Sequence, residues 1–124
     1  MVNKQNFYET YELFDQSVII EIIDIFISEY AERFEKLTKN IADRDFQSMR
    51  FNAHSLKGVI ANFSAPVPLE MVRAFEKTAA HLLETNGEDF DADTMSKNLE
   101  EIKKATFIMA DQLAEIKQEI ISKS

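Results

Sequence analysis

The chain has 124 residues, 45% of them hydrophobic, which suffices for one domain with its own apolar core. Its 14 Lys and Arg residues stand against 22 Asp and Glu residues, and the resulting net charge of −8 disfavours nucleic acid and anionic membranes as partners. Cysteine is absent and no uncharged apolar stretch of about 18 residues occurs, so disulfides, thiolate metal sites and a membrane span are excluded. We therefore expect a single cytoplasmic domain over residues 1–124.

Helical periodicity dominates the sequence, and only two glycines and two prolines are available for turns. The spacing of apolar residues predicts helices at about 17–42, 45–64, 67–86 and 92–121, preceded by one or two helical turns at 6–14. Short loops between long helices make chain neighbours antiparallel. We expect an all-α, antiparallel up-down four-helix bundle with a short N-terminal helical extension.

The helix predicted at 17–42 is apolar over more than one face. Asp15 and Ser17 are both candidate N-caps. The N-terminal half of the helix has more apolar residues than one neighbouring helix can cover, so either residues 6–14 or an oligomer contact must supply further cover. The core stripe comprises Ile19, Ile23, Phe26, Tyr30, Phe34, Leu37 and Ile41, and the further apolar residues are Val18, Ile20, Ile22, Ile25 and Ile27.

The helix predicted at 45–64 carries one of the two histidines, His54, on its outer face. Lys57 at i+3 and Gly58 at i+4 border the imidazole. A glycine inside a helix costs about 0.5–1 kcal/mol relative to alanine, and core packing does not explain a glycine on the outer face. Asn52 projects toward the core side, where a hydrogen bond to a neighbouring helix would account for it. The core face comprises Met49, Ala53, Leu56, Val59, Ile60 and Phe63.

The last two predicted helices carry regular core stripes. Pro66 and Pro68 mark the start of the helix at 67–86, and Gly87 is expected to end it as a left-handed cap. His81 also lies opposite the core stripe, but Glu84 at i+3 would repel a bound anion, so we interpret His81 as an ordinary surface residue. The stripes comprise Leu69, Val72, Phe75, Ala79, Leu82 and Leu83, and then Met95, Leu99, Ile102, Thr106, Met109, Leu113, Ile116 and Ile120.

The surroundings of His54 suit an imidazole that another protein approaches closely and that carries an anion. The outer face presents a titratable nucleophile, the cation of Lys57 and a notch at Gly58. The residues expected to dock a partner around it are Gln47, Arg50, Phe51 and Ala61.

The stretch "AHSLKGVIANFSA", residues 53–65, resembles the signature of histidine-containing phosphotransfer (HPt) domains of two-component phosphorelays. His54, Leu56, Lys57 and Gly58 match the family pattern directly. Ser64 stands where the family has its second glycine, and we expect a modest change in the end of the helix there. Segments before and after the motif are similar to the family as well, so the resemblance covers most of the chain.

The resemblance implies a phosphoryl carrier without a kinase activity or nucleotide site of its own. His54 would accept a phosphoryl group from, and donate it to, an aspartate of response-regulator receiver domains, with Lys57 offsetting the phosphate charge and Gly58 giving access. The partners would be receiver domains, a hybrid sensor histidine kinase, or both. No cofactor or metal is expected on this chain, since Mg²⁺ would belong to the receiver. We expect a monomer.

Three other interpretations compete with this one. A scaffold or interaction bundle without phosphoryl chemistry is opposed only by the His54, Lys57 and Gly58 constellation. A helix pair from a sensor kinase would carry an acidic residue at position 55 and a proline shortly downstream, where Ser55 and Gly58 stand. A metal-binding bundle would need Glu-x-x-His pairs, which the sequence lacks.

Overall fold

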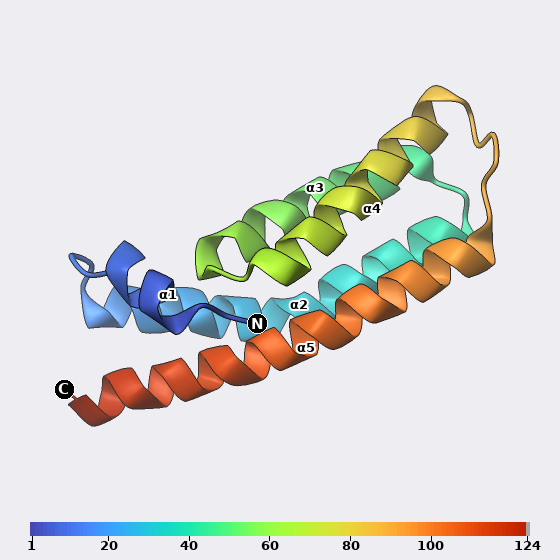
Figure 1. Cartoon of the computed structure of the whole chain (residues 1–124). Helices are drawn as coiled ribbons and strands as arrows, with labels where there is room; N and C mark the ends of the chain where they lie inside the picture. The colour runs from blue at the N-terminus through green and yellow to red at the C-terminus, as the bar shows by residue number, and fades with distance from the viewer. Residues whose placement is uncertain (124) are drawn as a thin grey trace.

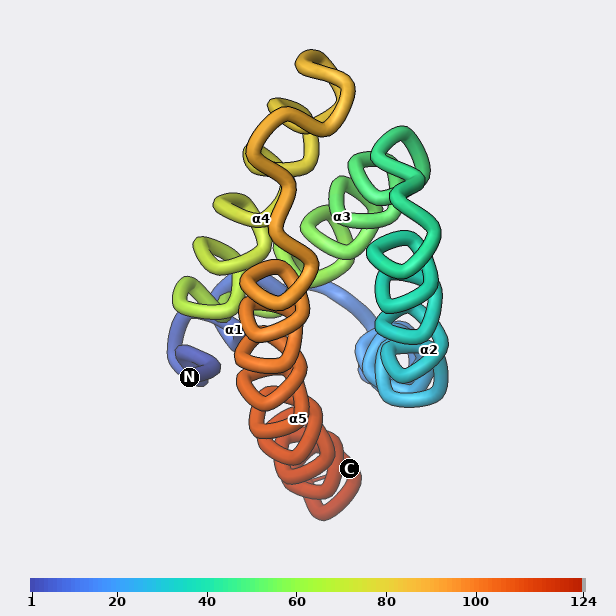
Figure 2. The backbone as a smooth tube through the Cα atoms, turned by 90° about the vertical axis from the view of Figure 1, so that its right-hand side faces the viewer, coloured from blue at the N-terminus to red at the C-terminus, as the bar shows by residue number. Residues whose placement is uncertain are grey.

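The computed structural model describes residues 1–123, in which helices form and no strand does. The elements are α1 (Lys4–Thr10), α2 (Gln16–Ala42), α3 (Phe46–Ile60), the 3₁₀ turn η1 (Ala61–Phe63), α4 (Pro66–Glu84) and α5 (Ala92–Lys123). Helices α2 to α5 form an antiparallel bundle (Figure 1), in which α3 and α4 lie together over α2 and α5 (Figure 2). The predicted fold class is confirmed. No helix within residues 1–123 combines the length and the apolar character needed to cross a membrane.

The short helix α1 covers the part of the bundle that α3 and α4 do not reach. With 27 and 32 residues, α2 and α5 are longer than α3 and α4, which have 15 and 19. Helix α1 lies over the N-terminal end of α2, beyond the end of the α3–α4 pair (Figure 1). Its Phe7 is fully buried, with its ring 6.4 Å from that of Phe63. The helix spans residues 4–10 instead of the expected 6–14, and its side chains bond to Ser64 and to Glu119 of α5. Val18 and Ile25 of α2 stay exposed, so the cover expected for α2 is incomplete.

Helix α3 begins where it was predicted but ends earlier. Asp45 is its N-cap and accepts a hydrogen bond from the Ser48 backbone N–H at 3.1 Å. The α-helix ends at Ile60, and η1 completes the segment expected to be helical to residue 64. Ser64 then adopts a left-handed conformation with φ 54° and ψ 44°. The segment thus ends at a serine in a conformation that favours glycine, and the modest change expected at this helix end stays a prediction.

Two expectations for the helix at 67–86 need correction. Leu83, placed in the core stripe, is 38% exposed, because the stripe of α4 drifts away from it in the last turn. Gly87 has the expected positive φ of 89°, but the left-handed segment begins one residue earlier, at Asn86, and the helix ends at Glu84. The Asn86 and Gly87 N–H groups donate to the Leu83 and Leu82 carbonyls. Of the two N-cap candidates, Asp15 and not Ser17 occupies the N-cap position of α2, but its side chain makes no capping hydrogen bond.

A hydrogen bond between α3 and α2 explains why Asn52 lies toward the core side of α3. Asn52 of α3 donates from Nδ2 to Oδ1 of Asn40 on α2 at 2.8 Å. Asn40 is only 8% exposed, so this hydrogen bond removes the cost of a buried unpaired amide oxygen. The pair fixes α3 against α2 two residues before His54.

Candidate functional site

His54 projects from the outer face of α3 with 73% of its side chain exposed. Its Nδ1 lies 2.8 Å from Oε1 of Glu76 on α4. An ionised carboxylate only accepts hydrogen bonds, so Nδ1 carries the proton in this pair. In the neutral ring the lone pair is then on Nε2, the nitrogen that this contact does not use.

Glu76 links His54 to the neighbouring cation. Its second oxygen, Oε2, accepts a hydrogen bond from Nζ of Lys57 at 2.8 Å. Burial by itself would raise the pKa of the Glu76 carboxyl, but the hydrogen bonds from Lys57 and His54 outweigh it and hold that pKa below its usual value. The group is therefore an ionised acceptor that holds the imidazole and the ammonium side by side, with 15% of the Glu76 side chain exposed.

Gly58 lies one turn after His54 on the exposed surface of α3. A Cβ added to it would meet no atom within 4 Å. The backbone there is helical, so neither the backbone conformation nor close helix packing requires glycine. What the glycine provides is open space beside the imidazole.

A surface hollow of about 370 Å³ joins His54 to three of the four expected docking residues. Its lining is Gln47, Arg50, Phe51, His54, Glu76 and Leu83. The fourth expected residue, Ala61, is exposed in η1 and lies outside this hollow. Phe51 is 72% exposed, which leaves a large apolar side chain open beside the histidine.

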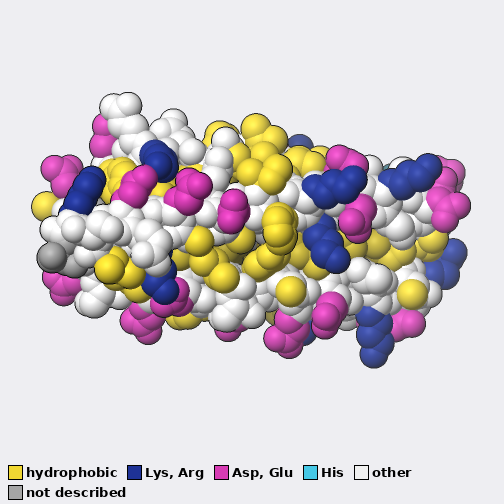
Figure 3. All heavy atoms as spheres, turned by 90° about the horizontal axis from the view of Figure 1, so that it is seen from below, with side chains coloured by type: hydrophobic (Ala, Val, Ile, Leu, Met, Phe, Trp, Pro, Cys, Tyr) yellow, Lys and Arg dark blue, Asp and Glu magenta, His cyan; other side chains and the backbone are white. Residues whose placement is uncertain are grey.

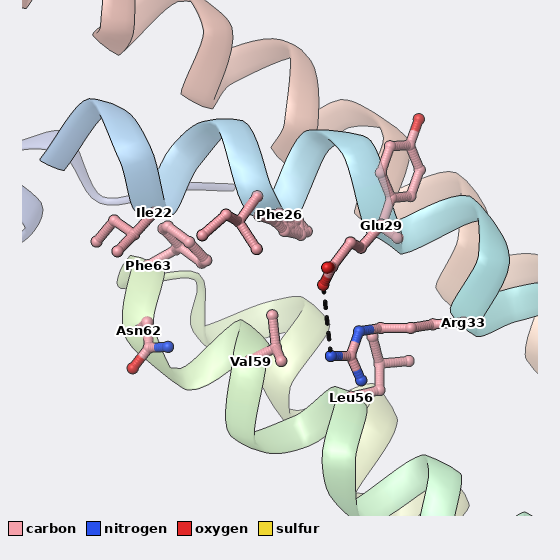
Figure 4. A pocket seen from close by; sticks show the side chains of 10 residues that line it. Ile22, Phe26, Glu29, Arg33, Leu56, Val59, Asn62 and Phe63 are labelled. Carbon is pink, nitrogen blue, oxygen red and sulfur yellow. Dashed lines mark ion pairs between the residues drawn. The ribbon is translucent and has the colours of Figure 1, made fainter. Parts of the chain in front are cut away.

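A second, apolar groove runs between α2 and α3 on the Val59 side of α3 (Figure 4). Its volume is about 150 Å³. Arg33 lies at its rim, donates from Nη1 to Ser55 Oγ at 2.7 Å, and pairs loosely with Glu29 at 3.9 Å. The lining comprises Ile22, Ile25, Phe26, Glu29, Tyr30, Arg33, Leu56, Val59, Asn62 and Phe63.

The helix that carries His54 is locally basic. Arg50 and Lys57 lie in α3, whereas no Asp or Glu occurs between Phe46 and Ile60, in a chain with 22 acidic residues. Within residues 1–123, no group of three or more His, Cys, Asp or Glu residues has the geometry to hold a metal ion. His81 is exposed on α4, and its ring forms no hydrogen bond or ion pair with another side chain within residues 1–123.

The sequence did not reveal Glu76, the place of Leu83 beside His54, or the apolar groove between α2 and α3. Glu76 follows His54 by 22 residues on a different helix, so only the packing of α3 on α4 brings them together. The excess apolar residues of α2, Ile22 and Ile25 among them, were the one signal of the groove. Leu83 gave no signal, because its spacing fits the core stripe.

The family model described as the Hpt domain matches residues 21–119. The chain belongs to the Hpt domain family. Members of this family are helical bundles that transfer phosphoryl groups through histidine in phosphorelays and interact with their response-regulator or kinase components. The predicted resemblance is thus confirmed, and the matched range contains the whole of α3 and α4. Comparisons with curated proteins and with solved structures gave no match.

Proposed function

We propose that His54 of this Hpt domain is the phosphoacceptor, and that it exchanges a phosphoryl group with the aspartate of receiver domains. The contact that carries the proposal is the hydrogen bond from Nδ1 to Glu76 at 2.8 Å, because it leaves Nε2 as the exposed nucleophile. The Nε2 lone pair attacks the phosphorus of a receiver aspartyl phosphate. An N–P bond forms, the acyl O–P bond breaks, and the aspartate leaves as a carboxylate.

Glu76 and Lys57 carry charges opposite to those that develop on the imidazole ring and on the phosphate during transfer. The ring becomes cationic when Nε2 binds phosphorus, and the Glu76 carboxylate stabilises the Nδ1–H that carries part of this charge. Lys57 brings an ammonium to the same edge of the ring, where it can offset the phosphate oxygens. No cofactor of this chain takes part in the proposed step, and the Mg²⁺ that assists it is assigned to the receiver.

The proposed receiver docks over α3 and buries the surface on both sides of His54. Gly58 lets its aspartate approach, and the exposed ring of Phe51 and the α2–α3 groove provide apolar contact. The absence of acidic residues from α3 suits a partner whose phosphorylation site is itself acidic.

The test is transfer from a purified phosphorylated receiver to this chain. We expect acid-labile, alkali-stable phosphate on the wild type and on His81→Gln, and none on His54→Gln. All three proteins should melt at nearly the same temperature, because both histidines are exposed. Phosphate on the His54→Gln protein would show that another residue accepts it.

A further inference from the structure

The face built by α2 and α5 carries apolar side chains that this chain leaves in solvent. Figure 3 shows a band of hydrophobic side chains along the middle of this face and no histidine in view. Phe107 of α5 is 64% exposed, and Ala31 of α2 is exposed as well. Counting seven residues from the Lys117–Asp24 pair along the antiparallel helices brings Ala110 opposite Ala31, two small residues close to Phe107 in the sequence register.

The charges around Phe107 form a self-complementary row. Lys103, Phe107 and Asp111 are exposed and follow one another at i, i+4 and i+8, which places them on one ridge of α5. Neither Lys103 nor Asp111 takes part in an ion pair among the described residues. Eight residues of helix span about 12 Å, so the two charges cannot pair within one copy.

We propose, in place of the monomer expected from the sequence, that two copies of this chain associate across a two-fold axis at Phe107. An antiparallel pairing of the two ridges lays Phe107 of each copy on that of the other and brings each Lys103 opposite the other copy's Asp111. This contact is isologous, as a closed dimer requires. A parallel pairing would set like charges opposite one another. Both copies of His54 stay accessible, because the α2–α5 face lies away from the face of α3 that carries it.

Sedimentation velocity on the full chain, from about 10 µM to about 1 mM at about 0.15 M salt, tests the proposal. We expect the wild type to move toward the mass of a dimer as concentration rises. Phe107→Ser, Lys103→Asp and Asp111→Lys should each remain monomeric, since each removes the central ring or sets like charges opposite one another. The double variant Lys103→Asp/Asp111→Lys should dimerise again, because the swap restores opposite charges across the axis.

Ile108→Ser is the matched control, since Ile108 is 47% exposed next to Phe107 but lies off the ridge. It should dimerise as the wild type does.

A wild type that stays monomeric at every concentration would overturn the proposal and would mean that a different protein covers this face. The proposal is also overturned if the single charge variants dimerise as the wild type does. A double variant that melts like the wild type and yet stays monomeric would overturn it as well. None of these outcomes depends on phosphoryl transfer.

Discussion

The Glu76 carboxylate accepts hydrogen bonds from both His54 and Lys57. Substitution can separate its role as a hydrogen-bond acceptor for the imidazole from its role as a negative charge. Glu76→Gln keeps an amide oxygen that can accept the Nδ1–H, whereas Glu76→Ala removes the acceptor. A hydrogen bond to a charged group is worth about 1.5–3 kcal/mol, and the part gained as the ring becomes cationic lowers the barrier, so Glu76→Ala should slow single-turnover transfer by up to about 100-fold. Glu76→Gln should stay much closer to the wild type.

Rapid-quench kinetics from a phosphorylated receiver measure this difference. Equal rates for Glu76→Ala and the wild type, with both proteins folded, would contradict the positioning role.

We expect that replacing Gly58 leaves the protein folded, whereas a large side chain at this position slows phosphoryl transfer. Because an added Cβ meets no atom within 4 Å, Gly58→Ala should stabilise the bundle by a few tenths to about 1 kcal/mol in urea unfolding. Gly58→Leu should fold as well but slow transfer, since its side chain fills the space beside the imidazole. A Gly58→Leu protein that transfers at the wild-type rate would show that access to His54 does not depend on this glycine.

The sequence could predict the residues of α3 beside His54 because they share one helix and follow its period. Helical projection placed His54, Lys57 and Gly58 on one exposed face, as the structure has them. The projection of a single helix could not predict the contact of Glu76 with His54. This contact depends on how α4 packs against α3. For Asn52, the sequence predicted a hydrogen bond to a neighbouring helix but could not identify Asn40 as the partner.

At the scale of elements, the link between η1 and α4 depends on a serine in a conformation that favours glycine. Ser64 has φ 54°, and a left-handed conformation costs an L-residue about 1–2 kcal/mol. Two contacts from the N-terminal segment partly offset this cost. The Asn3 backbone N–H donates to the Ser64 carbonyl at 2.8 Å, and Asn6 Nδ2 donates to Ser64 Oγ at 2.9 Å.

Ser64→Gly should therefore stabilise the chain by a few tenths to about 1 kcal/mol, because it relieves the backbone cost and loses only the exposed Asn6 contact. Ser64→Ala is the matched comparison, since it loses the same hydroxyl but keeps the strained backbone, and it should destabilise. Urea unfolding of both variants measures this difference. Equal stabilities of the glycine and alanine variants would show that φ at this position is not a source of strain.

Helix boundaries were less predictable than helix existence for a related reason. Apolar spacing continues through Phe63, so periodicity alone extends the helix to residue 64, while the backbone tightens to a 3₁₀ turn after Ile60. Leu83 fits the stripe of α4 by its spacing, yet it lies beside His54 in the hollow where α3 and α4 meet. In both cases the deciding contacts come from other helices.

At the scale of the whole molecule, the acidic chain presents one basic helix to its proposed partner. The net charge is −8, whereas α3 carries Arg50 and Lys57 and no carboxylate, and of these two cations Lys57 is paired with Glu76 of α4. At about 0.15 M salt the Debye length is about 8 Å, so the charges of α3 act on a docked receiver while those of the far face are largely screened. Local charge should therefore control docking more than net charge does.

Arg50 tests this conclusion, since it is exposed in the hollow beside His54 and forms no ion pair among the described residues. Arg50→Glu should lower kcat/KM for a phosphorylated receiver mainly by slowing association, and the deficit should shrink as salt rises from about 0.05 to about 0.5 M. Lys97→Glu makes the same change in net charge on exposed α5 and should leave kcat/KM nearly unchanged. Stopped-flow transfer across the salt series measures both variants. Equal losses in both would mean that net charge governs the encounter, and a deficit of Arg50→Glu that persists at high salt would mean a direct contact.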